Sequence, residues 1–313
     1  MEKMIRGLHH VTATVNDAQD DLNFYSGLLG QRLVKKTVNF DNPFVYHFYY
    51  GNEAGTPGTI MTTFPYKGMG VRGGTKGFGQ INVTSFSVPE ASLECWRNRL
   101  QEANVPLVDE PTPFGEAALS FTDTSDLRIR IVGAAKDDRR PWTGEGMLAE
   151  TAIRGIHSVQ LHAREPSLSV DFLTRMMDAT VVAENAGTTR LSIGAGVPGQ
   201  LVEVVDAAGQ PPAVNGLGTV HHVAFAVATS GEQLRMREEL LRAGAQVTDV
   251  RDRQYFTSIY FREPSGILFE IATLPPGFAV DEPLESLGRA LKLPPWEEPR
   301  RAEIQARLPD VIY

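Results

Sequence analysis

Four short stretches of the chain share one pattern, in which β-branched and aromatic residues dominate and successive side chains alternate in polarity. This pattern is typical of strands with a buried face. A proline or polar start signal follows each stretch and precedes an amphipathic run with helical spacing. The predicted strands span residues 7–15, 82–88, 155–161 and 220–227, and the predicted helices span 17–29, 89–103, 166–177 and 231–243.

Three further strand-like runs come after each predicted helix, separated by Gly, Asp, Asn or Pro. Gly30, Asn104 and Gly244 are suited to end three of the helices, because glycine and asparagine adopt the left-handed conformation found there. A βαβββ unit is therefore repeated four times, each copy being about a quarter of the chain. The pattern predicts an α+β fold made of four such modules.

The closing strand of each unit can be aligned on the turn that enters it, as in the fourth unit, where Gly266 precedes Glu270 by four residues. A second aligned position lies in the opening strands. In unit order, the closing strands offer Thr62, Arg130, Glu203 and Glu270, and the opening strands offer His10, Val83 or Asn82, Ser158 and His222.

His10, His222 and Glu270 form a candidate metal site. The motif His-His-Val occurs in the first and fourth units, and the carboxylate stands at the aligned position of the last strand. Two imidazoles and one carboxylate on one face of an octahedral ion leave positions free for substrate and O2, as in non-haem Fe(II) oxygenases. Residue type does not separate Fe(II) from Mn(II), so both metals stay open.

Composition excludes several other classes of protein. The chain has 313 residues, 42% of them apolar, and a formal charge of −8 with acidic and basic residues intermixed, so we expect no nucleic-acid partner. Residues 1–6 lack the apolar core of a signal peptide, and no run approaches the length of a membrane span, so we expect a cytoplasmic protein without membrane contact. The single cysteine, Cys95, excludes internal disulfides, and its place in a predicted amphipathic helix predicts core packing.

The double motif His-His-Val, together with the closing run Pro-Ser-Gly-Ile-Leu-Phe-Glu-Ile, resembles the vicinal oxygen chelate superfamily over residues 5 to 275. Within it the chain is most similar to ring-cleaving dioxygenases that act on hydroquinones and catechols. The resemblance implies paired modules that form two cupped mixed-sheet half-barrels, two histidines and one glutamate as metal ligands, and a small aromatic substrate and O2 as partners.

If His10, His222 and Glu270 bind one ion, the first and fourth units must share one cup. The second and third units would then form a second, metal-free cup. There we expect Arg130 and Glu203 to face each other as an ion pair, because two unpaired inward charges would be costly. Along the sequence the chain divides into residues 1–150 with units one and two, 151–275 with units three and four, and a proline-rich tail, 276–313. We expect the tail to lie across the body of the protein, and the protein to be a homo-oligomer.

Five further residues are candidates for contact with substrate or O2. Thr12 lies two residues from His10 and should share its face of the strand. Tyr260, Arg253 and either His9 or His221 match a tyrosine, an arginine and a histidine that the resemblance implies near the metal. Strand alternation points His9 and His221 away from the ligands unless a bulge intervenes. His157 is expected to be structural, and His47 and His162 receive no chemical role.

Two alternatives remain open on the sequence. A glyoxalase-like isomerase or lyase of the same fold would use a four-ligand pattern and retain Zn or Ni, although Thr62 offers only a hydroxyl at the fourth position. A metal-free binding protein of the resistance type would use the cup to sequester a small molecule and would not consume O2.

Overall fold

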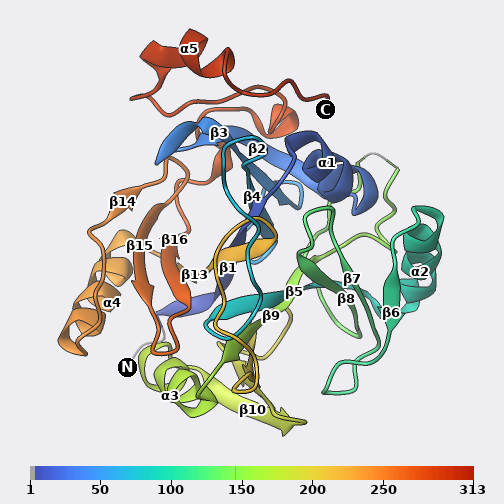
Figure 1. Cartoon of the computed structure of the whole chain (residues 1–313), viewed down its shortest axis with the longest axis vertical. Coiled ribbons are helices and arrows are strands. Elements are labelled where there is room, and N and C mark those ends of the chain that lie inside the picture. Colours follow the sequence, from blue (N-terminus) through green and yellow to red (C-terminus); the bar gives the residue numbers. More distant parts are fainter. Residues whose placement is uncertain (1–3, 145) are drawn as a thin grey trace.

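The computed structural model describes residues 4–144 and 146–313, which form two mixed eight-stranded sheets with helices on their outer faces (Figure 1). The strand order of the first sheet is β14 (Arg251–Asp252), β15 (Thr257–Arg262), β16 (Leu268–Thr273), β13 (Thr219–Val227), β1 (Ile5–Val15), β4 (Ile60–Pro65), β3 (Asn42–Gly51) and β2 (Arg32–Asn39). The order of the second is β10 (Thr180–Asn185), β11 (Thr188–Ser192), β12 (Leu201–Asp206), β9 (Gly155–Ala163), β5 (Gln80–Pro89), β8 (Arg128–Ala134), β7 (Ala118–Thr122) and β6 (Leu107–Asp109).

The first and fourth units share the first sheet, and the second and third share the second, so the predicted pairing of units is confirmed. The α+β class with paired βαβββ modules is confirmed as well. In each sheet the two opening strands meet antiparallel at the centre, β1 against β13 and β5 against β9, while each runs parallel to its own closing strand. Because each sheet takes strands from both halves of the sequence, the boundaries at 150 and 275 stay a prediction about sequence repeats.

The helices begin and end close to the predicted residues. Asp17 caps α1 (Ala18–Leu22), which continues as a π-helical turn, η1 (Asn23–Leu28). The others are α2 (Leu93–Glu102) after the 3-10 turn η2 (Glu90–Ser92), α3 (Pro166–Met176) and α4 (Ser230–Arg242). A capping box between Thr229 and Glu232 fixes the start of α4. No helix in the described ranges is long and apolar enough to cross a membrane.

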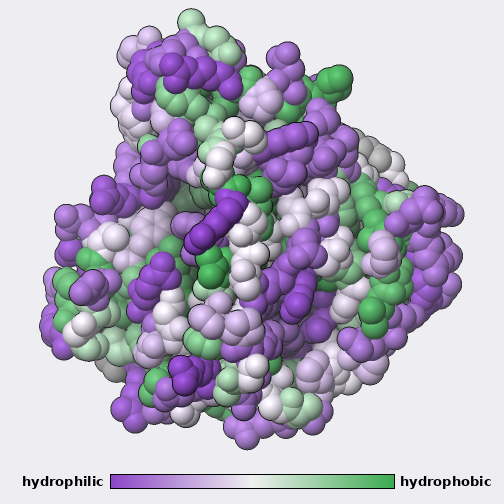
Figure 2. All heavy atoms as spheres, in the orientation of Figure 1, coloured by the Kyte–Doolittle hydropathy of each residue, from purple (hydrophilic) through white to green (hydrophobic). Residues whose placement is uncertain are grey.

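The prediction that Cys95 packs in the core is wrong. Its position in α2 is as predicted, but the side chain is exposed, because the buried face of the helix is defined by Trp96 and Leu100. Consecutive side chains on a helix point about 100° apart, so Cys95 points away from the face that Trp96 buries. Figure 2 shows hydrophilic side chains gathered over this helix, at the right edge of the view.

The C-terminal tail lies across the outer edge of the first sheet, as predicted for a segment that does not fold alone (Figure 1). Lys292 N–H donates to the carbonyl of Lys36 on β2, and Lys35 is fully buried between Asp281 and Glu282. The tail thus covers an edge strand that would otherwise expose unpaired backbone groups. Its short helical elements are η3 (Phe278–Val280), η4 (Leu284–Ser286), η5 (Glu298–Arg300) and α5 (Arg301–Gln305).

Candidate metal centre and pocket

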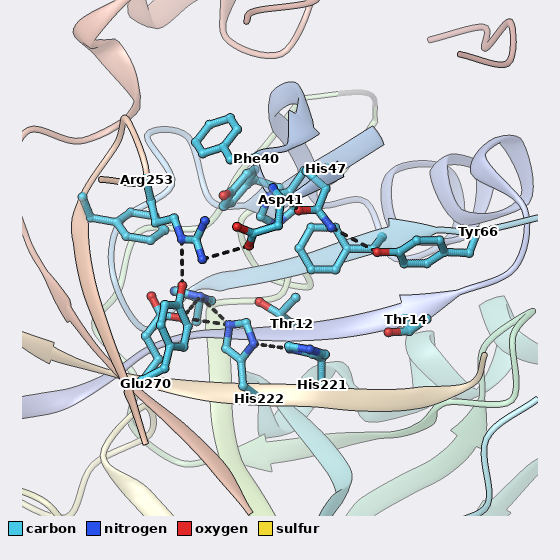
Figure 3. Close-up of a pocket in the computed structure, with 16 residues that line it drawn as sticks. Thr12, Thr14, Phe40, Asp41, His47, Tyr66, His221, His222, Arg253 and Glu270 are labelled. Atoms are coloured by element: carbon cyan, nitrogen blue, oxygen red, sulfur yellow. Dashed lines mark hydrogen bonds and ion pairs between the residues drawn. The ribbon is translucent and has the colours of Figure 1, made fainter. Parts of the chain in front are cut away.

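His10, His222 and Glu270 converge on one point in the first sheet, as the sequence predicted (Figure 3). The Nε2 atoms of the two histidines lie 3.3 Å apart, and Glu270 Oε2 lies 3.3 Å from His10 Nε2 and 2.8 Å from His222 Nε2. An octahedral ion with bonds of about 2.1 Å would separate neighbouring donors by about 3 Å. Glu270 Oε2 is buried and has no well-aligned hydrogen-bond donor, so the arrangement fits a divalent cation.

The central antiparallel pair of strands brings the histidines together. His10 lies opposite Ala224, and Thr12 lies opposite His222, so the two imidazoles stand two residues apart across the β1–β13 interface. Glu270 joins them from β16, where it lies beside Ala224. Three short segments far apart in the sequence therefore meet at one place, because the first and fourth units share a sheet.

The histidines before the two candidate ligands contact them directly. The register of β1 against β13 shifts at His9 and again at His221, so each occupies a β-bulge rather than the opposite face. His9 Nδ1 lies 2.9 Å from His10 Nδ1, and His221 Nδ1 lies 2.7 Å from His222 Nδ1. Strand alternation would point His9 and His221 away from the candidate ligands, but the bulges turn them toward these ligands. It leaves Nε2 of both inner histidines directed at the common point.

Burial and charge define the protonation of these groups. Burial, reinforced by the adjacent His10, lowers the pKa of His9 to about 3, and burial with the adjacent His222 lowers the pKa of His221 to about 3. Both outer rings are therefore neutral near pH 7 and can accept a hydrogen bond at Nδ1. Burial raises the pKa of Glu270, but the attraction of His10 and His222 outweighs it and holds that pKa well below its usual range. Glu270 is a carboxylate, and its Oε1 accepts from Ser258.

A cavity of about 260 Å³ opens in front of the three donors. This volume is close to the small end of the range for ligand pockets and suits a single aromatic ring. The cavity is lined by His10, Thr12, Thr14, Asn39, Phe40, Asp41, His47, Tyr49, Phe64, Tyr66, His221, His222, Arg253, Phe256, Tyr260 and Glu270.

Arg253 and Tyr260 contact each other and both line the cavity; Arg253 is labelled in Figure 3. Arg253 Nε donates to the Tyr260 hydroxyl at 3.0 Å, and Arg253 Nη2 lies 3.1 Å from Asp41 Oδ2. Asp41 comes from the β2–β3 turn, so this ion pair joins the first and fourth units. Burial raises the pKa of Tyr260, with the charge of Glu270 as a further cause, so the phenol stays protonated.

Thr12 lines the cavity together with His10, and it is supported by two residues, Thr62 and His47, that were not predicted to take part in the site. Thr62 Oγ1 donates to Thr12 Oγ1 at 2.8 Å, and His47 Nε2 lies 2.9 Å from Thr62 Oγ1. Sequence reasoning missed His47. Its signal is the repeat: Thr62 aligns with Glu270, and His47 takes the place relative to Thr62 that Ser258 takes relative to Glu270.

The second sheet holds a different arrangement at the equivalent positions, and the predicted ion pair of Arg130 with Glu203 is wrong. Glu203 is fully buried and pairs with Arg190, its direct neighbour on β11, at 2.6 Å. Arg130 donates to Ser120 at 3.3 Å. Arg190, which also pairs with Glu116, already supplies the counter-charge of Glu203, so Arg130 is not needed for it. His157 lies in this second sheet, with Ser158 and Glu116 as neighbours.

Residues 7–131 and 155–271 match the Glyoxalase/Bleomycin resistance protein/Dioxygenase superfamily. These two segments cover most of the four repeated units and both strands that carry the candidate histidines. The chain belongs to this superfamily, as the repeated motif predicted.

Relatives of similar length narrow the class of enzyme. MhqE of Bacillus subtilis (strain 168), provisionally named a ring-cleaving dioxygenase, is 46% identical over 97% of this chain and 99% of its own. The chlorohydroquinone/hydroquinone 1,2-dioxygenase of Sphingobium indicum is 33% identical over 100% of this chain and 98% of its own. A solved structure of a provisionally named dioxygenase from Bacillus subtilis superimposes with a TM-score of 0.94 at 40% identity, covering 99% of this chain and 98% of that one. The chain is an enzyme of the ring-cleaving dioxygenase group.

Proposed function

We propose that this chain is an extradiol-type dioxygenase that cleaves the ring of a hydroquinone or catechol at a mononuclear non-haem Fe(II) site. His10, His222 and Glu270 would hold the metal, with Mn(II) as the other candidate ion. The observation that carries the proposal is the convergence of three donors on one point, with their open side toward a cavity the size of one aromatic ring. The name of the Sphingobium relative supports the substrate class.

Bound Fe(II) would supply a positive charge that lowers the pKa of a phenol and a place for O2 beside it. The protein prepares this place with its outer histidines. When Nε2 of His10 or His222 faces a metal, its Nδ1 carries the proton and donates to Nδ1 of His9 or His221. Each doublet therefore fixes the ring orientation and tautomer of the inner histidine.

Arg253 and Tyr260 are placed to stabilise negative charge that develops on oxygen in the cavity. Tyr260 accepts from Arg253 and lines the pocket, so its O–H can turn to donate to an oxygen bound there. Donors that are fixed in advance and partly shielded from water stabilise such charge far better than mobile ones. We assign both residues to catalysis.

Thr12 is placed to donate to an oxygen close to His10. It accepts the hydroxyl hydrogen of Thr62, which leaves its own hydrogen for the cavity. Thr62 itself stands where a carboxylate would complete a four-ligand, glyoxalase-like set, and its hydroxyl is already engaged. This engagement supports a three-ligand site with room for both substrate and O2.

Metal analysis of anaerobically purified protein, followed by oxygen-electrode assays with hydroquinones and catechols, tests the proposal. We expect one iron or manganese per chain and O2 uptake with at least one of these phenols. His10→Ala, His222→Ala and Glu270→Ala should each abolish metal retention and O2 uptake, whereas His157→Ala, in the other sheet, should not. Stoichiometric zinc or nickel without O2 uptake would contradict the proposal. A loss of metal and O2 uptake in His157→Ala as large as in the three candidate-ligand variants would contradict it too.

A further inference from the structure

His47 presents an unused hydrogen-bond acceptor to the cavity. Its ring comes from β3 and is held between Tyr49 and Phe64, with ring centroids at 4.0 Å and 4.2 Å. Packing on two sides fixes the plane of the imidazole, so its two nitrogens have defined directions. One of them, Nε2, is bonded to Thr62, and the ring also lines the cavity.

The direction of the hydrogen bonds identifies the tautomer. Thr62 has one hydroxyl hydrogen and gives it to Thr12, so it can only accept from His47 Nε2. Burial lowers the pKa of His47 well below its usual value, and the charges of His10 and His222 add to this effect. A neutral ring protonated at Nε2 has a lone pair at Nδ1, which no described residue occupies and which is not sealed off from the cavity.

His47 also stands on the wall across from the candidate ligands. From β16, which carries Glu270, the sheet runs through β13, β1 and β4 before it reaches β3. The sheet curls so far that Arg253 on one side meets Asp41 on the other, closing a cup over the cavity. An aromatic ring held at the three donors through one oxygen would fill the rest of the cavity, whose lining includes His47.

We propose that His47 accepts a hydrogen bond from the substrate hydroxyl opposite the metal-bound oxygen, and that it selects 1,4-dihydroxybenzenes. This inference rests on the proposed function and names the substrate subclass. A 1,2-dihydroxybenzene carries both oxygens at the metal end and leaves Nδ1 unpartnered. A site built to bond a hydroxyl discriminates against analogues without it, because its own polar group then stays unpaired.

Anaerobic titration calorimetry of the iron-loaded protein tests this assignment without turnover. Three phenols serve as probes: hydroquinone, 4-fluorophenol and catechol. 4-Fluorophenol is similar in size to hydroquinone but lacks the second O–H. We expect the wild type to bind hydroquinone about tenfold more tightly than 4-fluorophenol, the factor typical of one neutral hydrogen bond. In His47→Phe the two affinities should become equal through loss of hydroquinone affinity alone, and His47→Gln, which retains an acceptor oxygen, should recover part of the difference.

Other variants separate His47 from its neighbours. Asp41→Asn and Tyr49→Phe change the other polar groups of the cavity and should keep the preference for hydroquinone, as should His162→Phe, a matched change in the second sheet. A preference that survives in His47→Phe, or disappears in Asp41→Asn or Tyr49→Phe instead, overturns the assignment. Equal weakening of both phenols in His47→Phe and His47→Gln also overturns it. Failure of the iron-loaded wild type to bind any of the three phenols overturns the proposed function and this inference together.

Discussion

His9 and His10 face each other through their Nδ1 atoms, 2.9 Å apart, and the pair is repeated by His221 and His222 at 2.7 Å. Two adjacent residues on a regular strand would point to opposite faces. Here a bulge at each outer histidine turns its ring back toward its neighbour. Each His-His doublet is therefore a candidate ligand together with the group that orients it.

Removing an outer histidine should weaken metal binding without removing a ligand. We expect His9→Phe and His221→Phe to lower the affinity for Fe(II) by about 10–100-fold, the usual effect of losing a hydrogen-bond partner of a ligating histidine. His9→Asn retains an acceptor oxygen and should lose less. Competition with a chelator measures the dissociation constants, with His157→Phe as the control. Unchanged affinity in both phenylalanine variants would show that the bulges do not support the site.

Arg253 should act on the reaction rather than on the metal. We expect Arg253→Met to lower kcat for O2 uptake by about 100-fold or more, since loss of one preorganised donor to a developing oxyanion typically costs 10²–10³. Tyr260→Phe should have a similar effect, because the two groups are hydrogen-bonded to each other. Iron content, measured on the same preparations, should stay near one per chain. Loss of iron from either variant would instead indicate a role in holding the metal centre together.

The repeat made the fold and the three candidate ligands predictable. His10, His222 and Glu270 stand at aligned positions of units with the same strand order, so their chemistry and their pairing could be read from the pattern. The sequence left open whether bulges occur at His9 and His221, because a one-residue shift of register depends on how two distant strands meet. Alignment along the sequence also could not show that Glu203 is paired by Arg190, its cross-strand neighbour on β11, and not by Arg130.

His47 shows a second kind of limit. It belongs to a strand rich in aromatic residues, where a histidine looks like one more packed ring. Its significance comes from Thr62, which is 15 residues away and becomes its neighbour only through the antiparallel pairing of β3 with β4. Once Thr62 is aligned with Glu270, the matching position of His47 follows from the cross-strand register. To recognise a residue such as His47 from the sequence, one must therefore know the strand pairing within each unit as well as the order of its strands.

Asp21 should make stability depend on pH. It is buried beneath β3 and β4, and burial raises its pKa to about 8, although hydrogen bonds from Thr63 and Tyr50 favour the charged form. Between about pH 4 and pH 8 the folded protein keeps a proton on Asp21 that the unfolded chain has lost, so the contribution of Asp21 to the free energy of unfolding falls as pH rises, by up to about 1.4 kcal/mol per pH unit. Urea unfolding of the wild type and of a variant that lacks the Asp21 carboxyl, at pH 5.5 and pH 8, isolates this contribution.

Asp21→Asn provides the comparison, because an amide does not titrate in this range. We expect the free energy of unfolding of the wild type, taken relative to that of the variant, to be lower at pH 8 than at pH 5.5. Other groups contribute equally in both proteins: burial raises the pKa of Asp123 to about 6, which acts in the same direction as Asp21, and the lowered pKa values of His9 and His221 act in the opposite direction. Equal pH dependence in both proteins would contradict the assignment to Asp21.

Lys35 should hold the C-terminal tail on the first sheet. Its ammonium group is fully buried and lies 2.6 Å from Asp281 Oδ1, with Glu282, also buried, as its second partner. Lys35→Met would leave a buried carboxylate without its counter-charge, which costs about 3–5 kcal/mol. Lys67→Met is the matched control, because Lys67 pairs with Asp17 at the exposed surface, where such pairs contribute little to stability. Urea unfolding should show the large loss only for Lys35→Met, and adding Glu282→Gln should restore part of it. A loss no larger than that of Lys67→Met would mean that apolar packing alone keeps the tail in place.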